Sequence, residues 1–120
     1  MAHINKRETG NSFEKLAGKY LEEKGLTIIE YNFYCKIGEI DIVARDGNYL
    51  VFVEVKYRRN NKLGSAVGAV TPANMRKICK TADYYMLTHR FKGDTPVRFD
   101  VVAIENGHLT HLKNAFDYIL

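Results

Sequence analysis

The order of apolar and polar positions along the chain predicts two helices and five strands. Apolar side chains recur at the spacing of one helix face in two segments, and they alternate or run continuously, as in strands, in five others. The predicted order is helix, three strands, helix and two strands, over residues 11–24, 26–34, 37–45, 49–57, 72–88, 97–104 and 108–112. Residues 49–57 are apolar on both faces, which is typical of a central strand.

Local signals support the boundaries of these elements. Thr71 and Pro72 are the preferred residue types for the cap and first position of the second helix. Asn106 and Gly107 are typical of a tight hairpin turn between the last two strands. The glycine-bearing polar stretch over residues 58–68 is expected to be a mobile loop.

Composition indicates one globular domain. Of 120 residues, 46% are hydrophobic and 27% are charged, which is ordinary for a folded soluble protein. We expect a flexible tail over residues 1–10 and a single domain over residues 11–120. Cys35 and Cys79 lack the spacing of a zinc site, which favours reduced thiols. No apolar stretch approaches the roughly 20 residues that a membrane span needs, so we expect a cytoplasmic protein with no membrane partner.

Charged side chains interrupt the second and third predicted strands. Glu39 and Asp41 are two residues apart, and so are Glu54 and Lys56. Because residues two apart share one face of a strand, three carboxylates and one ammonium group are predicted to converge. Ionised groups are rarely buried unless they are paired or bind a metal, so this convergence requires an explanation.

Two interpretations of this cluster follow from the residues alone. Lys56 can neutralise Asp41 or Glu54 in a structural ion pair on the sheet. Alternatively, carboxylates on adjacent strands offer the oxygen ligands that Mg²⁺ prefers, and the lysine can orient a water or hold a phosphate oxygen.

Positive charge is concentrated downstream of the cluster. Residues 56–92 contain nine basic side chains and one acidic, a formal charge of +8, whereas the rest of the chain has nine basic and thirteen acidic, a formal charge of −4. Such asymmetry is typical of a surface that binds a phosphate backbone, although a solvated helix face is the plainer alternative. The residues expected to contact nucleic acid are Arg58, Arg59, Lys62, Arg76, Lys77 and Lys80.

Glu14, His108 and His111 are the remaining residues with candidate chemistry. An Asn11 cap followed three residues later by Glu14 resembles a capping box, but the same carboxylate can also serve the site. The two histidines are three apart on a predicted strand and should face opposite sides. We interpret them as surface or edge residues rather than as metal ligands.

Four segments are distinctive when taken together. They are Gly38-Glu39-Ile40-Asp41; Leu50-Val51-Phe52-Val53-Glu54-Val55-Lys56 with Arg58; Ala69-Val70; and Arg98-Phe99-Asp100-Val101-Val102. Together they resemble the YraN family of bacterial nuclease-like proteins, over nearly the whole chain from about residue 13 to residue 116. The fold of these nucleases is named PD-(D/E)XK after its sequence motif, and Ile40 stands where that motif has the proline. Asn74 stands where many relatives are expected to carry lysine.

The resemblance implies an α/β, restriction-endonuclease-like (PD-(D/E)XK) fold with the order α-β-β-β-α-β-β and a mixed sheet flanked by helices. This layout is similar to that of archaeal Holliday-junction resolvases. It implies Glu14, Asp41, Glu54 and Lys56 as catalytic residues, with Asp41, Glu54 and Glu14 as ligands of Mg²⁺ or Mn²⁺.

The leading hypothesis is therefore a metal-dependent endonuclease that hydrolyses phosphodiester bonds in DNA, with branched DNA as a candidate substrate. The alternative is a non-catalytic nucleic-acid-binding protein that retains the nuclease-like fold. A partner-binding scaffold is the weakest hypothesis, because it leaves the basic segment unexplained. Resolvase-like relatives act as two-fold dimers, so a homodimer is a candidate assembly.

Overall fold

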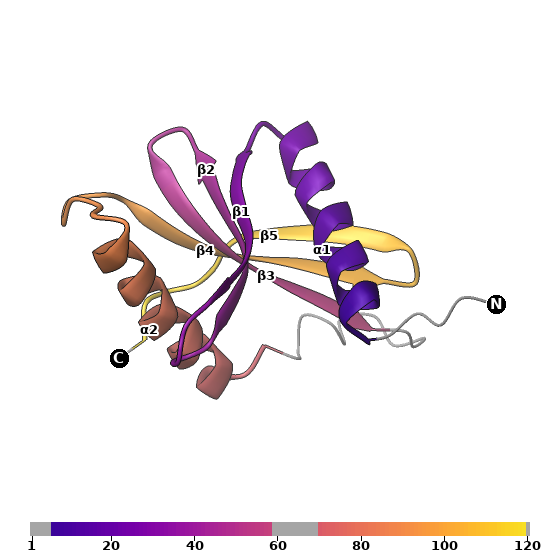
Figure 1. Ribbon diagram of the computed structural model, residues 1–120. Coiled ribbons are helices and arrows are strands. Elements are labelled where there is room, and N and C mark those ends of the chain that lie inside the picture. Colours follow the sequence, from indigo (N-terminus) through magenta and orange to yellow (C-terminus); the bar gives the residue numbers. More distant parts are fainter. Residues whose placement is uncertain (1–5, 59–69, 120) are drawn as a thin grey trace.

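The computed structural model shows a five-stranded mixed sheet with a helix on each face (Figure 1). It describes residues 6–58 and 70–119, and the side chains of the first helix from Ser12 onward. The elements are α1 (Lys6–Glu23), β1 (Thr27–Tyr34), β2 (Glu39–Asp46), β3 (Tyr49–Arg58), α2 (Pro72–Thr88), β4 (Val97–Glu105) and β5 (His108–Phe116). This is the predicted order, and it is compatible with a restriction-endonuclease-like fold, so the predicted fold class is confirmed.

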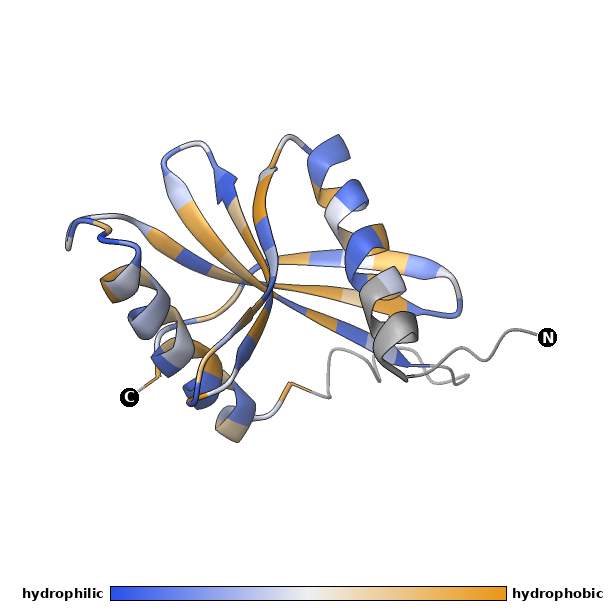
Figure 2. Cartoon of the chain, in the orientation of Figure 1, coloured by the Kyte–Doolittle hydropathy of each residue, from blue (hydrophilic) through white to orange (hydrophobic). Residues whose placement is uncertain are grey.

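The strands lie side by side in chain order, from β1 at one edge to β5 at the other. Neighbouring strands are antiparallel except β3 and β4, which are parallel and are connected through α2. The central strands are largely apolar along their length (Figure 2), and buried apolar residues form a core on each face of the sheet. On β3, Leu50 and Phe52 pack in the core under α2, whereas Val51 and Val53 pack in the core under α1, as the apolar pattern predicted.

Helix α1 begins at Lys6 rather than near Asn11 or Ser12. Residues 6–10, predicted as part of a flexible tail, are therefore helical, and residues 1–5 lie outside the described chain. The stretch contains no proline, and a single glycine costs a helix only about 1 kcal/mol, which the buried Ala17 and Leu21 further along can offset. Because Asn11 lies inside the helix, it is not an N-cap, and the capping-box explanation of Glu14 is wrong.

The local signals for α2 and for the last hairpin are confirmed. Thr71 Oγ1 accepts a hydrogen bond from the Asn74 N–H at 3.2 Å, and Pro72 is the first helical residue. Asn106 and Gly107 adopt φ values of 49° and 81°, the left-handed conformation that this turn requires. Strand β5 continues to Phe116, beyond the predicted end, because it stays paired with β4 across a register shift.

Candidate active site

A switch in strand β2 places Asp41 at the centre of the candidate site. Ile40 packs in the core under α2 and Ile42 in the core under α1, although residues two apart on a regular strand share a face. Opposite this point on β1, Asn32 has a φ of 56°, a conformation that Asn tolerates better than most residues. Both β1 and β2 therefore depart from regular strand geometry at the level of Asp41.

The backbone pairing between β2 and β3 ends at the pair Ile42 and Val53, so it does not reach the neighbouring residue Asp41. Beyond that pair, the Asp41 side chain replaces the backbone contact, because its Oδ2 accepts a hydrogen bond from the Val55 N–H at 2.8 Å. This contact holds the Asp41 carboxyl beside Glu54, with which it also forms a hydrogen bond.

Glu14 from α1 and Glu39 from β2 join Asp41. One carboxylate oxygen from each of the three residues lies within 4.8 Å of the others. Burial and then the negative charge of Asp41 raise the pKa of Glu14 from 4.5 to about 7. Within the described part of the chain, Glu14 Oε2 is buried without a hydrogen-bond partner. Because Glu14 does not belong to a capping box, we attribute its position to the carboxylate cluster.

Glu54 and Lys56 extend the cluster along β3. The Glu54 side chain is 17% exposed, and burial followed by the charge of Asp41 raises its pKa from 4.5 to about 9. Lys56 Nζ lies 3.6 Å from Glu54 Oε1, so the predicted proximity of these charges is present. The structure thus brings together Glu14, Asp41, Glu54 and Lys56. Their catalytic and metal-binding roles stay predictions.

Glu39 is a candidate ligand that the sequence analysis placed beside Asp41 but did not assign to a metal. Its carboxylate belongs to the three-residue cluster with Glu14 and Asp41, whereas Glu54 contacts this cluster by its hydrogen bond with Asp41. The spacing of Glu39 and Asp41 is the sequence signal for this ligand, whereas the ligand set implied by the family resemblance is Asp41, Glu54 and Glu14.

Helix α2 closes the other side of a cleft of about 260 Å³ over these carboxylates. The cleft is lined by Gly38, Glu39, Asp41, Glu54, Lys56, Asn74, Lys77 and Ile78. Gly38 permits the close approach of the helix, because a Cβ atom there would lie 3.1 Å from Thr81 Oγ1. Asn74 and Lys77 thereby face the carboxylates across the cleft.

The basic residues expected to contact nucleic acid fall into three groups. Lys77 lines the cleft, whereas Arg76 and Lys80 are exposed elsewhere on α2. Arg58 is exposed at the end of β3, where its guanidinium donates to the Tyr57 carbonyl at 3.0 Å. Arg59 and Lys62, with the rest of the predicted mobile loop, lie outside the described residues.

The sequence profile of one protein family, described as "Uncharacterised protein family UPF0102", matches residues 13–104. The chain belongs to the UPF0102 family. The matched span contains all four residues Glu14, Asp41, Glu54 and Lys56. The expected membership of the YraN family is confirmed by this match.

Several curated UPF0102 proteins are similar to this chain over most of its length. One from Lachnoclostridium phytofermentans is 47% identical over 114 residues, which cover 95% of this chain and 97% of the relative. One from Legionella pneumophila is 42% identical over a segment that covers 92% of this chain and 96% of the relative. One from Vibrio vulnificus is 46% identical, covering 90% of each chain. None of the helices in the described part of this UPF0102 chain is long and apolar enough to cross a membrane.

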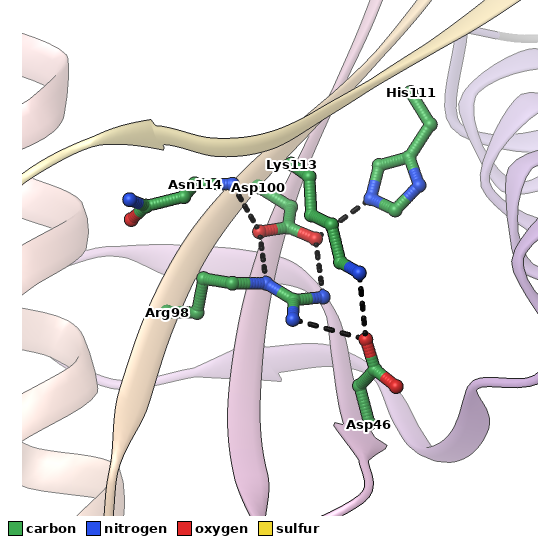
Figure 3. Close-up of polar contacts among 6 residues, drawn as sticks. All are labelled: Asp46, Arg98, Asp100, His111, Lys113 and Asn114. Atoms are coloured by element: carbon green, nitrogen blue, oxygen red, sulfur yellow. Dashed lines mark hydrogen bonds and ion pairs between the residues drawn. The ribbon is translucent and has the colours of Figure 1, made fainter.

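A second polar cluster in this UPF0102 protein was not predicted (Figure 3). Asp100 on β4 is fully buried and accepts hydrogen bonds from Arg98 Nε at 2.8 Å, from Arg98 Nη2 at 3.0 Å and from the Asn114 N–H at 2.9 Å. His111 Nε2 lies 2.7 Å from the same carboxylate. Arg98 Nη1 also forms an ion pair with Asp46 Oδ2 at 2.9 Å, so the cluster connects β4 and β5 to the end of β2.

The Asp100 cluster corrects one part of the prediction for His111: the residue lies on the edge strand β5, as predicted, but its side chain is not at the surface. The His111 side chain is only 4% exposed, because it packs against Asp100. Burial alone raises the pKa of Asp100, but the hydrogen bonds from His111, Arg98 and the Asn114 N–H outweigh burial and hold the pKa below its ordinary value. The available signal was the pair of charges at Arg98 and Asp100 within an otherwise apolar strand.

Proposed function

We propose that this protein is a Mg²⁺- or Mn²⁺-dependent endonuclease that hydrolyses phosphodiester bonds in DNA, branched DNA included. One observation carries the proposal: carboxylates from β2 and β3 line a cleft together with Lys56 and Lys77, and the Glu14 carboxylate from α1 lies beside those of Glu39 and Asp41. Carboxylates repel one another, so their convergence favours a site for a divalent cation. The two lysines supply charge that complements a phosphodiester.

The carboxylate cluster fits a hard divalent cation. Its donors are carboxylate oxygens, and Glu14 Oε2 is buried without a hydrogen-bond partner in the described residues. We assign Asp41, Glu54 and Glu14 as candidate ligands, and add Glu39. A bound cation would stabilise negative charge on the phosphate as a Lewis acid.

Lys56 is suited to act on the phosphate as well as on Glu54. Its 3.6 Å contact with Glu54 is longer than a hydrogen bond, so the ammonium group keeps donors for another partner. At this position Lys56 can donate to a phosphate oxygen as negative charge develops there. Asn74 and Lys77, on the opposite wall of the cleft, can hold the phosphodiester in place.

Cleavage assays on linear duplex, single-stranded and four-way-junction DNA test the proposal. We expect cleavage in Mg²⁺ or Mn²⁺ and none in a chelator, with activity lost in Asp41→Asn and Glu54→Gln. Asp94→Asn is the control, since Asp94 is an exposed acid that does not line the cleft. Retention of DNA without any cleavage would favour the alternative, a non-catalytic nucleic-acid-binding protein. Absence of both would overturn the two functions together.

A further inference from the structure

The turn between β1 and β2 presents apolar side chains at the edge of the cleft. Tyr34 is 59% exposed and Ile37 is 42% exposed, and Lys36 between them is exposed as well. The Cys35 N–H donates to the Gly38 carbonyl at 3.0 Å, which closes the turn. Large apolar side chains grouped beside a charged cleft are typical of a binding surface.

Two neighbours tie this turn to the carboxylate cluster. Tyr34 is paired directly with Glu39, whose carboxylate lies with those of Glu14 and Asp41. Side chains of directly paired residues stand on the same face of a sheet, with Cβ atoms about 5 Å apart. Gly38, which follows Ile37, lines the cleft itself. Tyr34 and Ile37 therefore lie at the rim of the candidate active site.

The hydrophobic core does not explain Tyr34. The preceding residue, Phe33, packs edge-on against Tyr85 with ring centroids 5.0 Å apart. By contrast, the Tyr34 ring makes no ring contact with any residue in the described part of the chain. An aromatic residue that is more than half exposed at the rim of a charged cleft is available to a ligand.

Resting on the proposed function, we propose that Tyr34 stacks on an unpaired base of the DNA strand whose phosphate occupies the cleft. Ile37 supports the same base, and Lys36 contacts a neighbouring phosphate. Aromatic rings stack on any exposed base, whereas the bases of an intact duplex are already stacked on one another. The site therefore selects DNA that has an unpaired nucleotide beside the scissile phosphate.

Binding measured without cleavage tests this selection. Fluorescence anisotropy with a labelled single strand and with a blunt duplex of the same sequence, in Ca²⁺ to slow hydrolysis, compares wild type with Tyr34→Ala, Tyr34→Phe and Ile37→Ala. Ile29→Ala is the matched control, because Ile29 is 41% exposed on the same strand, β1, but does not adjoin the turn. Unfolding curves of each variant verify the fold.

We expect Tyr34→Ala to weaken single-strand binding roughly tenfold, the effect of losing one base–aromatic stack, while duplex binding changes less than about twofold. Tyr34→Phe should bind like wild type, Ile37→Ala should lose part of the single-strand affinity, and Ile29→Ala should lose none. A strand carrying 2-aminopurine should be quenched by wild type and not by Tyr34→Ala.

Two results would overturn the inference, and they are distinguishable. If wild type binds and cuts DNA but Tyr34→Ala binds single strands unchanged, or loses equal affinity for duplex, the base-stacking role is wrong and the nuclease proposal stands. If wild type binds neither form of DNA, both proposals fail.

Discussion

The backbone N–H of Val55 donates a hydrogen bond of 2.8 Å to the Asp41 carboxylate, across fourteen residues of chain. The bond forms where the paired register of β2 and β3 stops. Val55 lies between Glu54 and Lys56 on β3. The hydrogen bond therefore holds Asp41 against the segment that carries these two charged side chains. A single side chain thus replaces a ladder hydrogen bond and assembles the candidate site.

Asp41→Asn should separate this structural contact from metal binding. The amide oxygen of Asn can still accept the Val55 N–H, while the negative charge beside Glu14 and Glu54 is removed. We expect the metal-free variant to unfold at an equal or higher temperature than wild type, and to lose the rise that Mn²⁺ produces in wild type. Thermal unfolding with and without Mn²⁺ measures both effects. An equal rise in Asp41→Asn would contradict a metal site there, whereas Asp94→Asn should keep the rise.

Metal affinity should increase with pH. Burial and neighbouring negative charge raise the pKa of Glu14 to about 7 and of Glu54 to about 9, so at neutral pH Glu54 holds its proton and Glu14 is partly protonated, and a cation must displace these protons. The ionised, metal-binding forms accumulate as pH rises through 7 toward 9. Calorimetric titration with Mg²⁺ across this range should show tighter binding and proton release. A dissociation constant independent of pH would count against Glu14 and Glu54 as ligands.

The metal-free protein should show the opposite trend in stability. The folded pKa values of Glu14 and Glu54 lie above the ordinary value of 4.5, so the folded state binds protons more tightly than the unfolded state. Stability from these groups is therefore complete below pH 4.5 and is lost as pH rises toward 9. Urea unfolding in a chelator measures this slope, which Glu54→Gln should reduce. A slope unchanged in Glu54→Gln would exclude this origin.

Lys56→Met distinguishes a catalytic lysine from an ion-pair partner. If Lys56 serves the reaction, the variant should lose on the order of 10²–10³ in single-turnover cleavage rate while its stability in Mg²⁺ changes little. If Lys56 only neutralises the partly buried Glu54, 3.6 Å away, the variant should instead lose roughly 3–5 kcal/mol of stability. We expect the first pattern. Lys92→Met, at an exposed position that does not line the cleft, should change neither quantity.

Asp100→Asn should be strongly destabilising without affecting DNA binding. The change leaves the buried Arg98 and His111 without their carboxylate, which we expect to cost roughly 3–5 kcal/mol in urea unfolding. The pKa of Asp100 lies below 3.8, so its stabilisation is complete above pH 3.8 and is lost as pH falls through the folded value. Asp117→Asn, at an exposed position, should change stability by less than about 0.5 kcal/mol. A similar small change in Asp100→Asn would show that the cluster is not structural.

Lys77→Ala should weaken DNA binding through one phosphate contact. Lys77 lines the cleft, so its removal should reduce the slope of log affinity against log salt concentration by about 1, with similar losses for single-stranded and duplex DNA. Lys92→Ala is the control, since Lys92 is exposed and does not line the cleft. Anisotropy titrations over a range of salt concentrations measure the slope. An unchanged slope in Lys77→Ala would place the phosphate contact elsewhere.

Features that depend on neighbouring residues were predictable from the chain. The apolar run of β3, the Thr71–Pro72 start of α2 and the Asn106–Gly107 turn are short-range patterns, and backbone sterics and burial act on them in the same way in any fold. The period of two along a strand was also sufficient to place Glu54 beside Lys56.

Features that depend on segments distant in sequence required the folded structure. Alternation along β2 does not reveal the switch at Asp41, where β1 has the left-handed Asn32 and the Val55 N–H of β3 donates to the Asp41 carboxylate. The same long-range packing brought Glu14 to Glu39. It also buried His111, because whether a polar strand position is covered depends on what packs on that face. Residue types and short spacings follow from local chemistry, whereas burial, carboxylate proximity and the resulting pKa shifts are properties of the assembled sheet and helices.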